Sequence, residues 1–306
     1  MAARRTTSHR KARVRPRSAN DQARRPRRRL LWSVAILAPF LALAALLLRP
    51  AWSDSPSSAS EPPRATTSTG ARSAARLRVD VVESYPHDPA AFTQGLLLED
   101  GVLYESTGLS GQSSLREVEL ETGRVLRRLD IPAPEFAEGL ALVGQRLVQL
   151  TYTSGRAFEY ELDTFERQGE LTYSGEGWGL CYDGSSLVMS NGSDRLTYRD
   201  PESFAVQREL SVTRDESPLV NINELECVGD SVYANVWNSE TIVRIEGSTG
   251  RVTEQIDASG LLSPDARRST DVLNGIAYDG STKTFLITGK LWPRLFRVRF
   301  VPTRQS

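Results

Sequence analysis

The chain has 306 residues and no net formal charge, with 38 Lys and Arg residues against 38 Asp and Glu residues. This length allows one large domain or two ordinary ones. The balance hides an asymmetry, because residues 1–29 hold twelve Lys and Arg residues and one acid, Asp21, and so carry +11. A basic run can indicate nucleic-acid binding. This one directly precedes an apolar segment, so we expect no nucleic-acid partner.

The apolar segment spans residues 30–48 and contains no charged residue. A helix of that length would extend about 28 Å, close to the hydrocarbon thickness of a bilayer. The sequence therefore predicts a basic cytoplasmic tail over residues 1–29 and a transmembrane signal-anchor over residues 30–48, with the rest of the chain outside the cytoplasm. A cleaved leader that releases a secreted protein is the alternative, although no small-residue cleavage site follows Leu48.

Residues 49–76 are rich in Ser, Pro, Ala and Thr and contain almost no large apolar residues. Such a segment cannot bury enough surface to fold, so we expect a disordered tether. The folded domain then covers residues 77–306.

One short motif recurs five times in the folded domain. It combines a small or polar residue with an apolar run and then a turn such as Asp100-Gly101 or Gly229-Asp230. Each period holds four short strands, which predicts an all-β fold, a five-bladed β-propeller. A β-sandwich is the alternative, but five in-phase copies disfavour it. Counted from Gly95, the steps are 44, 40, 45 and 51 residues, to Gly139, Gly179, Glu224 and Gly275.

The fifth repeat has too little strand sequence after Thr288 to complete a blade. Residues 77–82 alternate like a strand and precede the first repeat. We expect this N-terminal strand to complete the fifth blade, which would close the ring and remove its open edge.

Cys181 and Cys227 are the two cysteines, and the predicted topology places them in an oxidising compartment. The repeat alignment matches Cys181 with Glu226 and Cys227 with Tyr182, one register apart. Because successive residues of a strand point to opposite faces of a sheet, we expect the two thiols to face apart. Each cysteine is then a free core residue.

His9 and His87 are the two histidines, and no spacing of Cys and His indicates zinc. No Gly-x-Ser-x-Gly elbow accompanies His87 either. Zinc chemistry and a serine-hydrolase triad are therefore disfavoured.

Aromatic and polar residues occupy the start of the repeated strand, at one mouth of the predicted central channel. Such a set makes a pocket able to hold a small polar group against aromatic rings. The residues are Phe92, Gln94, Phe136, Glu138, Trp178, Asn223, Glu224 and Asn274, with Tyr152, Trp237 and Lys290 near the ends of second strands.

Six strings in this region resemble the plant-type glutaminyl cyclases, glutaminyl-peptide cyclotransferases that also occur in bacteria. They cover about residues 85–300 in order, whereas the tail and the anchor have no counterpart in the family pattern. The strings are FTQG at 92–95, YESTG at 104–108, FAEG at 136–139, NELE at 223–226, ANVW at 234–237 and GKLWP at 289–293.

The resemblance implies a five-bladed catalytic propeller that converts N-terminal glutamine to pyroglutamate and releases ammonia. It implies that Glu138 is the essential acid/base. Tyr152 stands where we expect tryptophan, so it departs from the pattern. The implied substrate-binding residues are Phe92, Gln94, Phe136, Trp178, Asn223, Trp237 and Lys290, to which we add Tyr152.

The implied chemistry suits these residue types. The α-amine and the side-chain amide belong to one molecule, so the enzyme has chiefly to move protons. We expect Phe136 and the nearby tryptophans to raise the pKa of Glu138, which would carry a proton from the amine to the leaving ammonia. Gln94 and Asn223 would hold the amide, and Lys290 or one of these amides would stabilise the oxyanion.

We expect no required cofactor and no catalytic metal, because the channel mouth lacks clustered carboxylates. A structural cation on the propeller axis, near Glu224 and Glu226, is compatible with the sequence.

The expected partners are peptides or proteins with N-terminal Gln, and the membrane through residues 30–48; the expected assembly is a monomer. Two alternatives stay open, a propeller that binds a peptide end or a sugar without turnover, and a calcium-dependent lactonase-type propeller.

Overall fold

The computed structural model describes residues 73–303, which lie in the compact unit Thr66–Ser306. These residues form β-strands almost throughout. The one α-helix among them, α1 (Pro264–Arg267), has four residues and buries none of them. The described part of the chain is therefore all-β.

Three separate four-stranded antiparallel sheets form the first three blades, and each follows chain order from the inner strand to the outer strand. Blade 1 contains β2 (Thr93–Glu99), β3 (Val102–Thr107), β4 (Ser114–Glu119) and β5 (Arg124–Asp130). Blade 2 contains β6 (Ala137–Val143), β7 (Arg146–Thr151), β8 (Arg156–Glu161) and β9 (Arg167–Thr172). Blade 3 contains β10 (Leu180–Tyr182), β11 (Leu187–Ser190), β12 (Arg195–Arg199) and β13 (Val206–Ser211).

One eight-stranded sheet supplies the other two blades, and the short pair β14 (Thr213–Arg214) and β15 (Ser217–Pro218) precedes it. Blade 4 contains β16 (Ile222–Val228), β17 (Ser231–Val236), β18 (Thr241–Glu246) and β19 (Val252–Asp257). Blade 5 contains β20 (Leu273–Asp279), β21 (Thr284–Gly289), β22 (Arg294–Pro302) and β1 (Ala75–Pro86).

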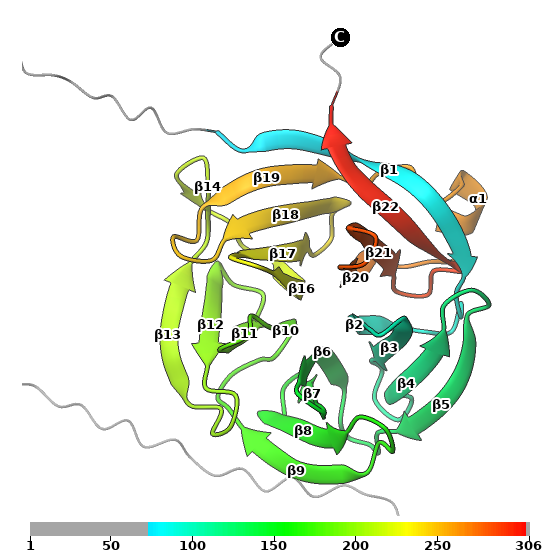
Figure 1. Ribbon diagram of the computed structural model, residues 1–306, viewed down its shortest axis with the longest axis vertical. Helices are drawn as coiled ribbons and strands as arrows, with labels where there is room; N and C mark the ends of the chain where they lie inside the picture. The colour runs from blue at the N-terminus through cyan, green and yellow to red at the C-terminus, as the bar shows by residue number, and fades with distance from the viewer. Residues whose placement is uncertain (1–72, 304–306) are drawn as a thin grey trace, which may run out of the picture. The chain divides into compact units, whose positions relative to one another are not determined.

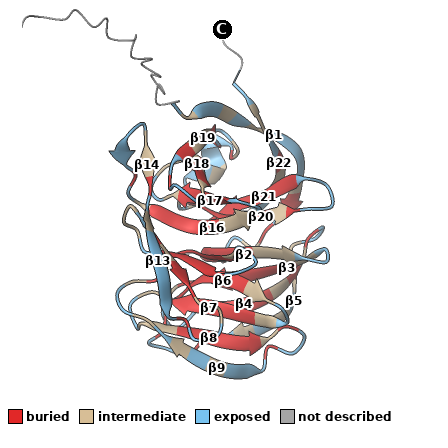
Figure 2. Ribbon diagram, turned by 60° about the vertical axis from the view of Figure 1, so that its left-hand side comes forward, coloured by how far each residue is buried: buried red, intermediate tan, exposed pale blue. Residues whose placement is uncertain are grey.

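The five blades surround a common axis, with the inner strands β2, β6, β10, β16 and β20 nearest to it (Figure 1). Burial follows this arrangement, because inner strands are covered on both faces by neighbouring blades and outer strands are not (Figure 2). In blade 1, exposed and half-buried residues alternate along the outer strand β5, whereas the first four residues of β2 are all buried. The repeated motif thus forms the innermost strand of each blade.

The N-terminal strand closes the ring, as the alternation of residues 77–82 predicts. β1 pairs antiparallel with β22 from Leu77↔Pro302 to Pro86↔Arg294. Its first four residues also pair in parallel with β19, from Ala75↔Glu254 to Arg78↔Asp257. The strand therefore covers the edges of two blades.

The predicted fold class needs two corrections. First, blades 4 and 5 are not separate sheets, because the parallel pairing of β1 joins them. Second, none of the helices in residues 73–303 is long and apolar enough to cross a membrane. The predicted span at residues 30–48, like the tail at 1–29 and most of the tether at 49–76, lies outside the described residues. The structure of residues 73–303 supports an all-β fold class, and the predicted transmembrane helix is not part of that class.

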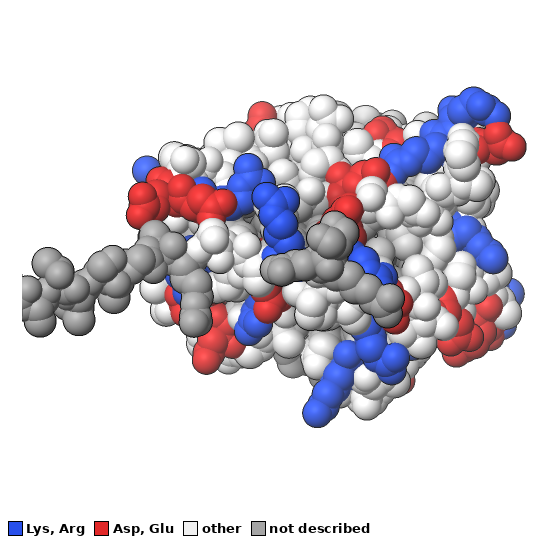
Figure 3. Space-filling view, turned by 90° about the horizontal axis from the view of Figure 1, so that it is seen from above, with Lys and Arg blue, Asp and Glu red and all other residues white. Residues whose placement is uncertain are grey.

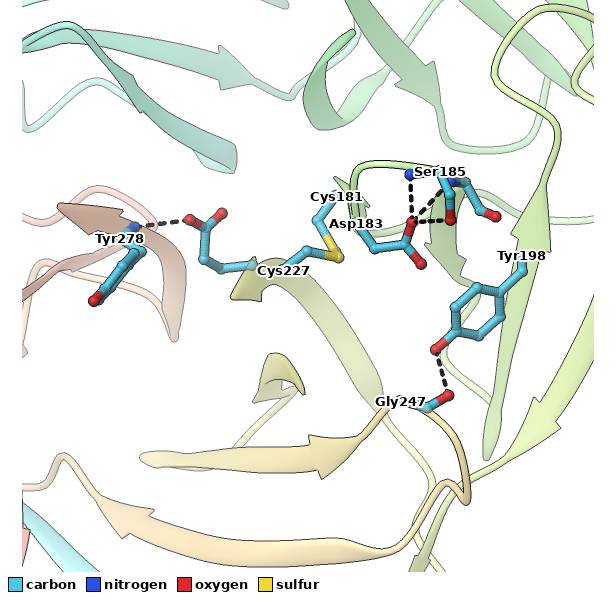
Figure 4. Close-up of a disulfide and its surroundings, with 9 residues drawn as sticks. Cys181, Asp183, Ser185, Tyr198, Cys227, Gly247 and Tyr278 are labelled. Carbon is cyan, nitrogen blue, oxygen red and sulfur yellow. Dashed lines mark hydrogen bonds between the residues drawn. A yellow bond between two sulfur atoms is a disulfide. The ribbon is translucent and has the colours of Figure 1, made fainter. Parts of the chain in front are cut away.

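The prediction of two free cysteines is wrong, because Cys181 and Cys227 form a disulfide with a Cα–Cα distance of 5.5 Å (Figure 4). The bond joins β10 of blade 3 to β16 of blade 4. The two residues do point to opposite faces of their own sheets. In a ring, however, neighbouring sheets meet through opposite faces, so Cys181 faces blade 4 and Cys227 faces blade 3. Both residues pack in the same core cluster between these blades.

Surface charge is mixed on the side of the propeller that carries β1 and β22. Figure 3 shows Lys and Arg side chains interspersed with Asp and Glu side chains on this face. Among the described residues in this view, acidic side chains separate the basic ones, unlike the continuous basic surface that binds nucleic-acid phosphates. That this protein has no nucleic-acid partner stays a prediction.

Truncation tests the closure by β1. A chain that begins at residue 73 should melt cooperatively, whereas one that begins at residue 85 should lose cooperative unfolding, because it leaves the edges of β19 and β22 unpaired. Thermal unfolding followed by far-ultraviolet circular dichroism measures this. A cooperative melt of the shorter chain at an unchanged midpoint would contradict the closing role of β1.

Reduction tests the disulfide. The bond closes a sequence separation of 46 residues, for which loop entropy predicts a stabilisation of about 4 kcal/mol. Urea unfolding with and without a phosphine reductant should show a loss of that order. The double variant Cys181→Ala/Cys227→Ala is the control, since the reductant should not change its stability. Equal midpoints for the oxidised and reduced wild type would contradict a stabilising bond.

Candidate active site

β-bulges shape the start of four inner strands. In each one the pairing register shifts within the first few residues of the strand. A bulge breaks the alternation of a strand and re-aims a side chain. The residues within the four shifts include Gln94, Glu138, Asn223 and Asn274.

The glycine of the repeat marks where neighbouring inner strands touch. A Cβ atom at Gly139 would collide with the backbone nitrogen of Leu180 in the next blade, and one at Gly179 would collide with the carbonyl oxygen of Asn223. The Gly139 amide also donates to the carbonyl of Trp178 at 2.7 Å. Only glycine allows this approach, which excludes water from the polar residues beside it.

Glu138 lies at the end of a chain of amide hydrogen bonds that crosses three blades. Asn274 Nδ2 donates to Gln94 Oε1 at 3.2 Å and to the carbonyl of Thr93 at 3.0 Å. Gln94 Nε2 in turn donates to Glu138 Oε1 at 3.0 Å. All three side chains are buried, and Glu138 is 5% exposed. The chain fixes the orientation of the Glu138 carboxyl group.

Burial raises the pKa of Glu138 well above its usual range, and the charge of Lys290 opposes that rise. Lys290 is also buried, which lowers its pKa, while Glu138 and Asp271 act in the opposite direction. Its ammonium group lies over the ring of Phe92, 4.9 Å from the centroid. Both ionisable groups are therefore buried in an environment that disfavours the charged form of each.

Two groups of aromatic rings line this region. Phe136 lies between Phe92, at a centroid distance of 6.1 Å, and Tyr152, at 5.9 Å. Trp178 and Trp237 meet edge to face at 5.8 Å and an interplanar angle of 82°. Trp237 is 42% exposed, so an aromatic surface is available at the mouth.

Glu176 is a carboxylate near the site that the sequence analysis missed. It accepts a hydrogen bond from Trp178 Nε1 at 2.9 Å. Its charge is a further cause of the raised pKa of Glu138, and together with burial it raises the pKa of Tyr152. The only signal was its place two residues before Trp178, ahead of the repeated strand rather than in it.

Asn223 and Glu224 have different surroundings. Asn223 is 2% exposed, and its backbone carbonyl accepts a hydrogen bond from Ser190 Oγ at 2.6 Å. Glu224 accepts from the backbone amides of Leu96, at 3.2 Å, and Ile276, at 2.9 Å. Its carboxylate thus joins blade 4 to blades 1 and 5, which is a structural role.

The structure brings together Phe92, Gln94 and Lys290 of blades 1 and 5 with Phe136, Glu138 and Tyr152 of blade 2. Trp178 donates to Glu176, which adds to the effect of burial in raising the pKa of Tyr152 in this group. The ring of Trp178 contacts the ring of Trp237. Asn223 makes no hydrogen bond to these side chains among the described residues. Within residues 73–303, no group of three or more His, Cys, Asp or Glu side chains is placed to hold a metal ion. The expectations about metals and cofactors stay predictions.

A buried carboxyl group, a buried ammonium group and aromatic rings at the mouth of a propeller define an enzyme-like site. Comparison with known proteins gives its class. Residues 55–300 match the model of the glutamine cyclotransferase family. The chain is 40% identical over 228 residues to the glutaminyl-peptide cyclotransferase of Arabidopsis thaliana, across 72% of this chain and 71% of that protein.

The crystal structure of the Myxococcus xanthus glutaminyl cyclase matches with a TM-score of 0.69 and 40% sequence identity, covering 76% of this chain and 100% of that one. The chain belongs to the glutamine cyclotransferase family. It is therefore an enzyme of the cyclotransferase class, and the resemblance found from the sequence is confirmed.

Replacement of Glu138 tests the effect of its burial on stability. Because its folded-state pKa is raised, the folded protein holds this proton more tightly than the unfolded chain does. Stability from this group is present below the unfolded pKa and is lost as pH rises toward the folded pKa. The Tm of Glu138→Gln relative to wild type should therefore increase from pH 4 to pH 8.

The control is Glu121→Gln, at an exposed position, whose Tm difference from wild type should stay constant over this pH range. Differential scanning calorimetry measures both variants. A Tm difference for Glu138→Gln that shrinks as pH rises would show that the carboxylate is stabilised, not penalised, by its surroundings.

Proposed function

We propose that this enzyme converts the N-terminal glutamine of peptides and proteins to pyroglutamate with release of ammonia, and that Glu138 shuttles the proton. Membership of the glutamine cyclotransferase family supports the reaction. The observation that carries the role of Glu138 is its buried carboxyl group, hydrogen-bonded by Gln94 and with Lys290 as counter-charge.

The reaction forms one carbon–nitrogen bond and breaks another. The α-amine nitrogen attacks the side-chain amide carbon, which gives a tetrahedral intermediate with charge on oxygen. The carboxylate of Glu138 takes a proton from the attacking amine and delivers it to the departing nitrogen. The carbon–oxygen double bond then re-forms as ammonia leaves. A single carboxyl group is sufficient because one proton lost by the amine is the proton that ammonia needs.

The raised pKa of Glu138 suits both halves of this shuttle. A carboxyl group with an ordinary pKa would be too weak a base for the amine, whereas a raised pKa brings its affinity for protons nearer to that of the two nitrogens. A free α-amine titrates near pH 7.7–8.0. The rate should therefore rise through this range as the neutral amine appears.

The other residues position the substrate and stabilise charge. Gln94 already uses Nε2 for Glu138 and Oε1 for Asn274, so we assign it to orienting the carboxyl group rather than to holding the substrate amide. We therefore assign Asn223 to holding the side-chain amide of the substrate. Lys290, whose cation lies over Phe92, stabilises the oxyanion.

Aromatic rings form the walls of the proposed site. The wall of the site near Glu138 is formed by Phe92, Phe136 and Tyr152. At the mouth, the glutamine side chain is enclosed by Trp178 and Trp237. Exclusion of water strengthens the electrostatic interactions inside. No step of this mechanism requires a metal or another cofactor.

The disulfide supports a location outside the reducing cytoplasm. Cys181 and Cys227 are bonded, and such bonds persist mainly in oxidising compartments. We propose an extracytoplasmic enzyme that acts on exported peptides or proteins as a monomer.

Ammonia release from a Gln-initiated dipeptide in the presence of a chelator tests the proposal. The full chain should release ammonia at a rate that the chelator does not change. Glu138→Gln should lower kcat by about 10²–10⁴-fold, the usual contribution of general acid–base catalysis. The exposed-site variant Glu121→Gln should retain wild-type turnover.

Three other outcomes would each contradict one part of the proposal. Binding of the dipeptide without turnover would show a binding module. Loss of ammonia release with the chelator would show that the reaction depends on a metal ion, contrary to the metal-free mechanism. A folded Glu138→Gln protein with near-wild-type turnover would remove Glu138 from the mechanism.

A further inference from the structure

A cavity of about 400 Å³ lies between blades 2 and 3. This volume is within the usual range for ligand pockets. The cavity includes Glu176, which contacts Trp178 of the candidate site. It also includes Arg199, on β12 of blade 3. The cavity therefore shares Glu176 with the surroundings of Trp178 and has a cationic residue in its wall.

Arg199 is a buried arginine without a carboxylate partner among the described residues. It is 7% exposed. Its Nε lies 3.2 Å from Met189 Sδ, and one Nη donates to the carbonyl of Phe204 at 3.0 Å. The guanidinium group also stacks on Phe204 and Tyr173, at 4.8 and 5.7 Å from the ring centroids. The other Nη has no hydrogen-bond partner within residues 73–303.

Another buried arginine of this fold, Arg116, is paired with carboxylates. Arg116 is 3% exposed and lies 2.8 Å from an oxygen of Asp88 and 3.7 Å from one of Glu105. An unpaired buried charge is costly, and pairing with a carboxylate offsets the cost. Glu209 also lines the cavity, but it is exposed and ion-paired with Arg195 at 3.3 Å, and it makes no ion pair with Arg199 within residues 73–303. Arg199 thus lacks the partner that its burial calls for.

Tyr173 lies between the cavity and the site. Its ring contacts Phe204 at 5.9 Å, and its hydroxyl donates to the carbonyl of Thr151, at the end of β7. Burial raises the pKa of the Tyr173 hydroxyl; the charge of Glu138 adds to this rise, and the charge of Arg199 opposes it. A Cβ atom at Gly177, the residue before Trp178, would collide with the Tyr173 hydroxyl. Tyr173 therefore joins the wall of the cavity to the segment that carries Trp178.

We propose that the cavity is a substrate subsite in which Arg199 binds a carboxylate carried by a residue downstream of the N-terminal glutamine. The assignment rests on the proposed function, since it requires a Gln-initiated peptide in the site. The free Nη of Arg199 donates to the carboxylate, and the hydroxyl groups of Thr172, Ser174 and Thr197 on the cavity wall are further donors. The preferred substrates are then peptides with an acidic residue shortly after glutamine.

A peptide series with the full chain tests the subsite. The reference is Gln-Ala-Ala-Ala-amide, and three further peptides carry a single Glu at position 2, 3 or 4. Ammonia release gives kcat/KM for each. One acidic position should exceed the reference by about tenfold, the range expected for one charge-assisted hydrogen-bonded pair.

Arg199→Met should reduce this ratio to about one, because methionine fills similar space without charge. The matched control is Arg208→Met on the neighbouring strand β13, which removes an exposed arginine that does not line the cavity and should leave the ratio unchanged. Ser174→Glu is a second test at an exposed cavity position. The new carboxylate should pair with Arg199 or repel the acidic peptide, so acidic peptides should become poorer substrates than the reference. This test does not depend on whether Arg199→Met folds.

The outcomes separate the subsite from the proposed function. Turnover of the reference with no preference for any acidic position, or a preference that survives Arg199→Met, would overturn the subsite and leave the cyclase function intact. A preference that Ser174→Glu leaves unchanged would overturn the subsite in the same way. Absence of ammonia from the reference peptide would overturn both proposals.

Discussion

The close approach of the inner strands around one axis is the constraint on which the site depends. Where Gly139 and Gly179 face the next blade, a Cβ atom would meet backbone, so the strands come together more closely than side chains permit. Water is excluded from the polar residues that the bulges turn toward this region. The raised pKa of Glu138 follows from that exclusion, because burial penalises the charged form.

Such burial is tolerated because the polar groups satisfy one another across blades. Asn274 donates to Gln94 and Gln94 donates to Glu138. Glu224 accepts from two backbone amides in two other blades. These bonds offset the desolvation of each group. They also hold the blades in register, so the same interactions that stabilise the ring position the carboxyl group for proton transfer.

Much of this could be predicted from local patterns. The repeat period located the five inner strands, and alternation in residues 77–82 identified the closing strand. Gln94 and Glu138 were found because they stand at equivalent places at the start of the repeated strand, and Lys290 because it stands near the end of a second strand. The errors have geometric causes. Cys181 and Cys227 were placed on opposite faces correctly, but only closure of the ring makes those faces meet. Glu176 and Arg199 lie outside the repeated strings, so no pattern marked them.

By itself the sequence determined the all-β repeat, the strand that completes it and the residues available for chemistry, because spacing and alternation are local properties of the chain. The tertiary structure decided which of those residues share a site. It decided that Gln94 orients Glu138, that β1 joins two blades into one sheet, and that a buried arginine faces a cavity beside Glu176. These are contacts between segments far apart in the chain, and their geometry exists only once the ring has closed.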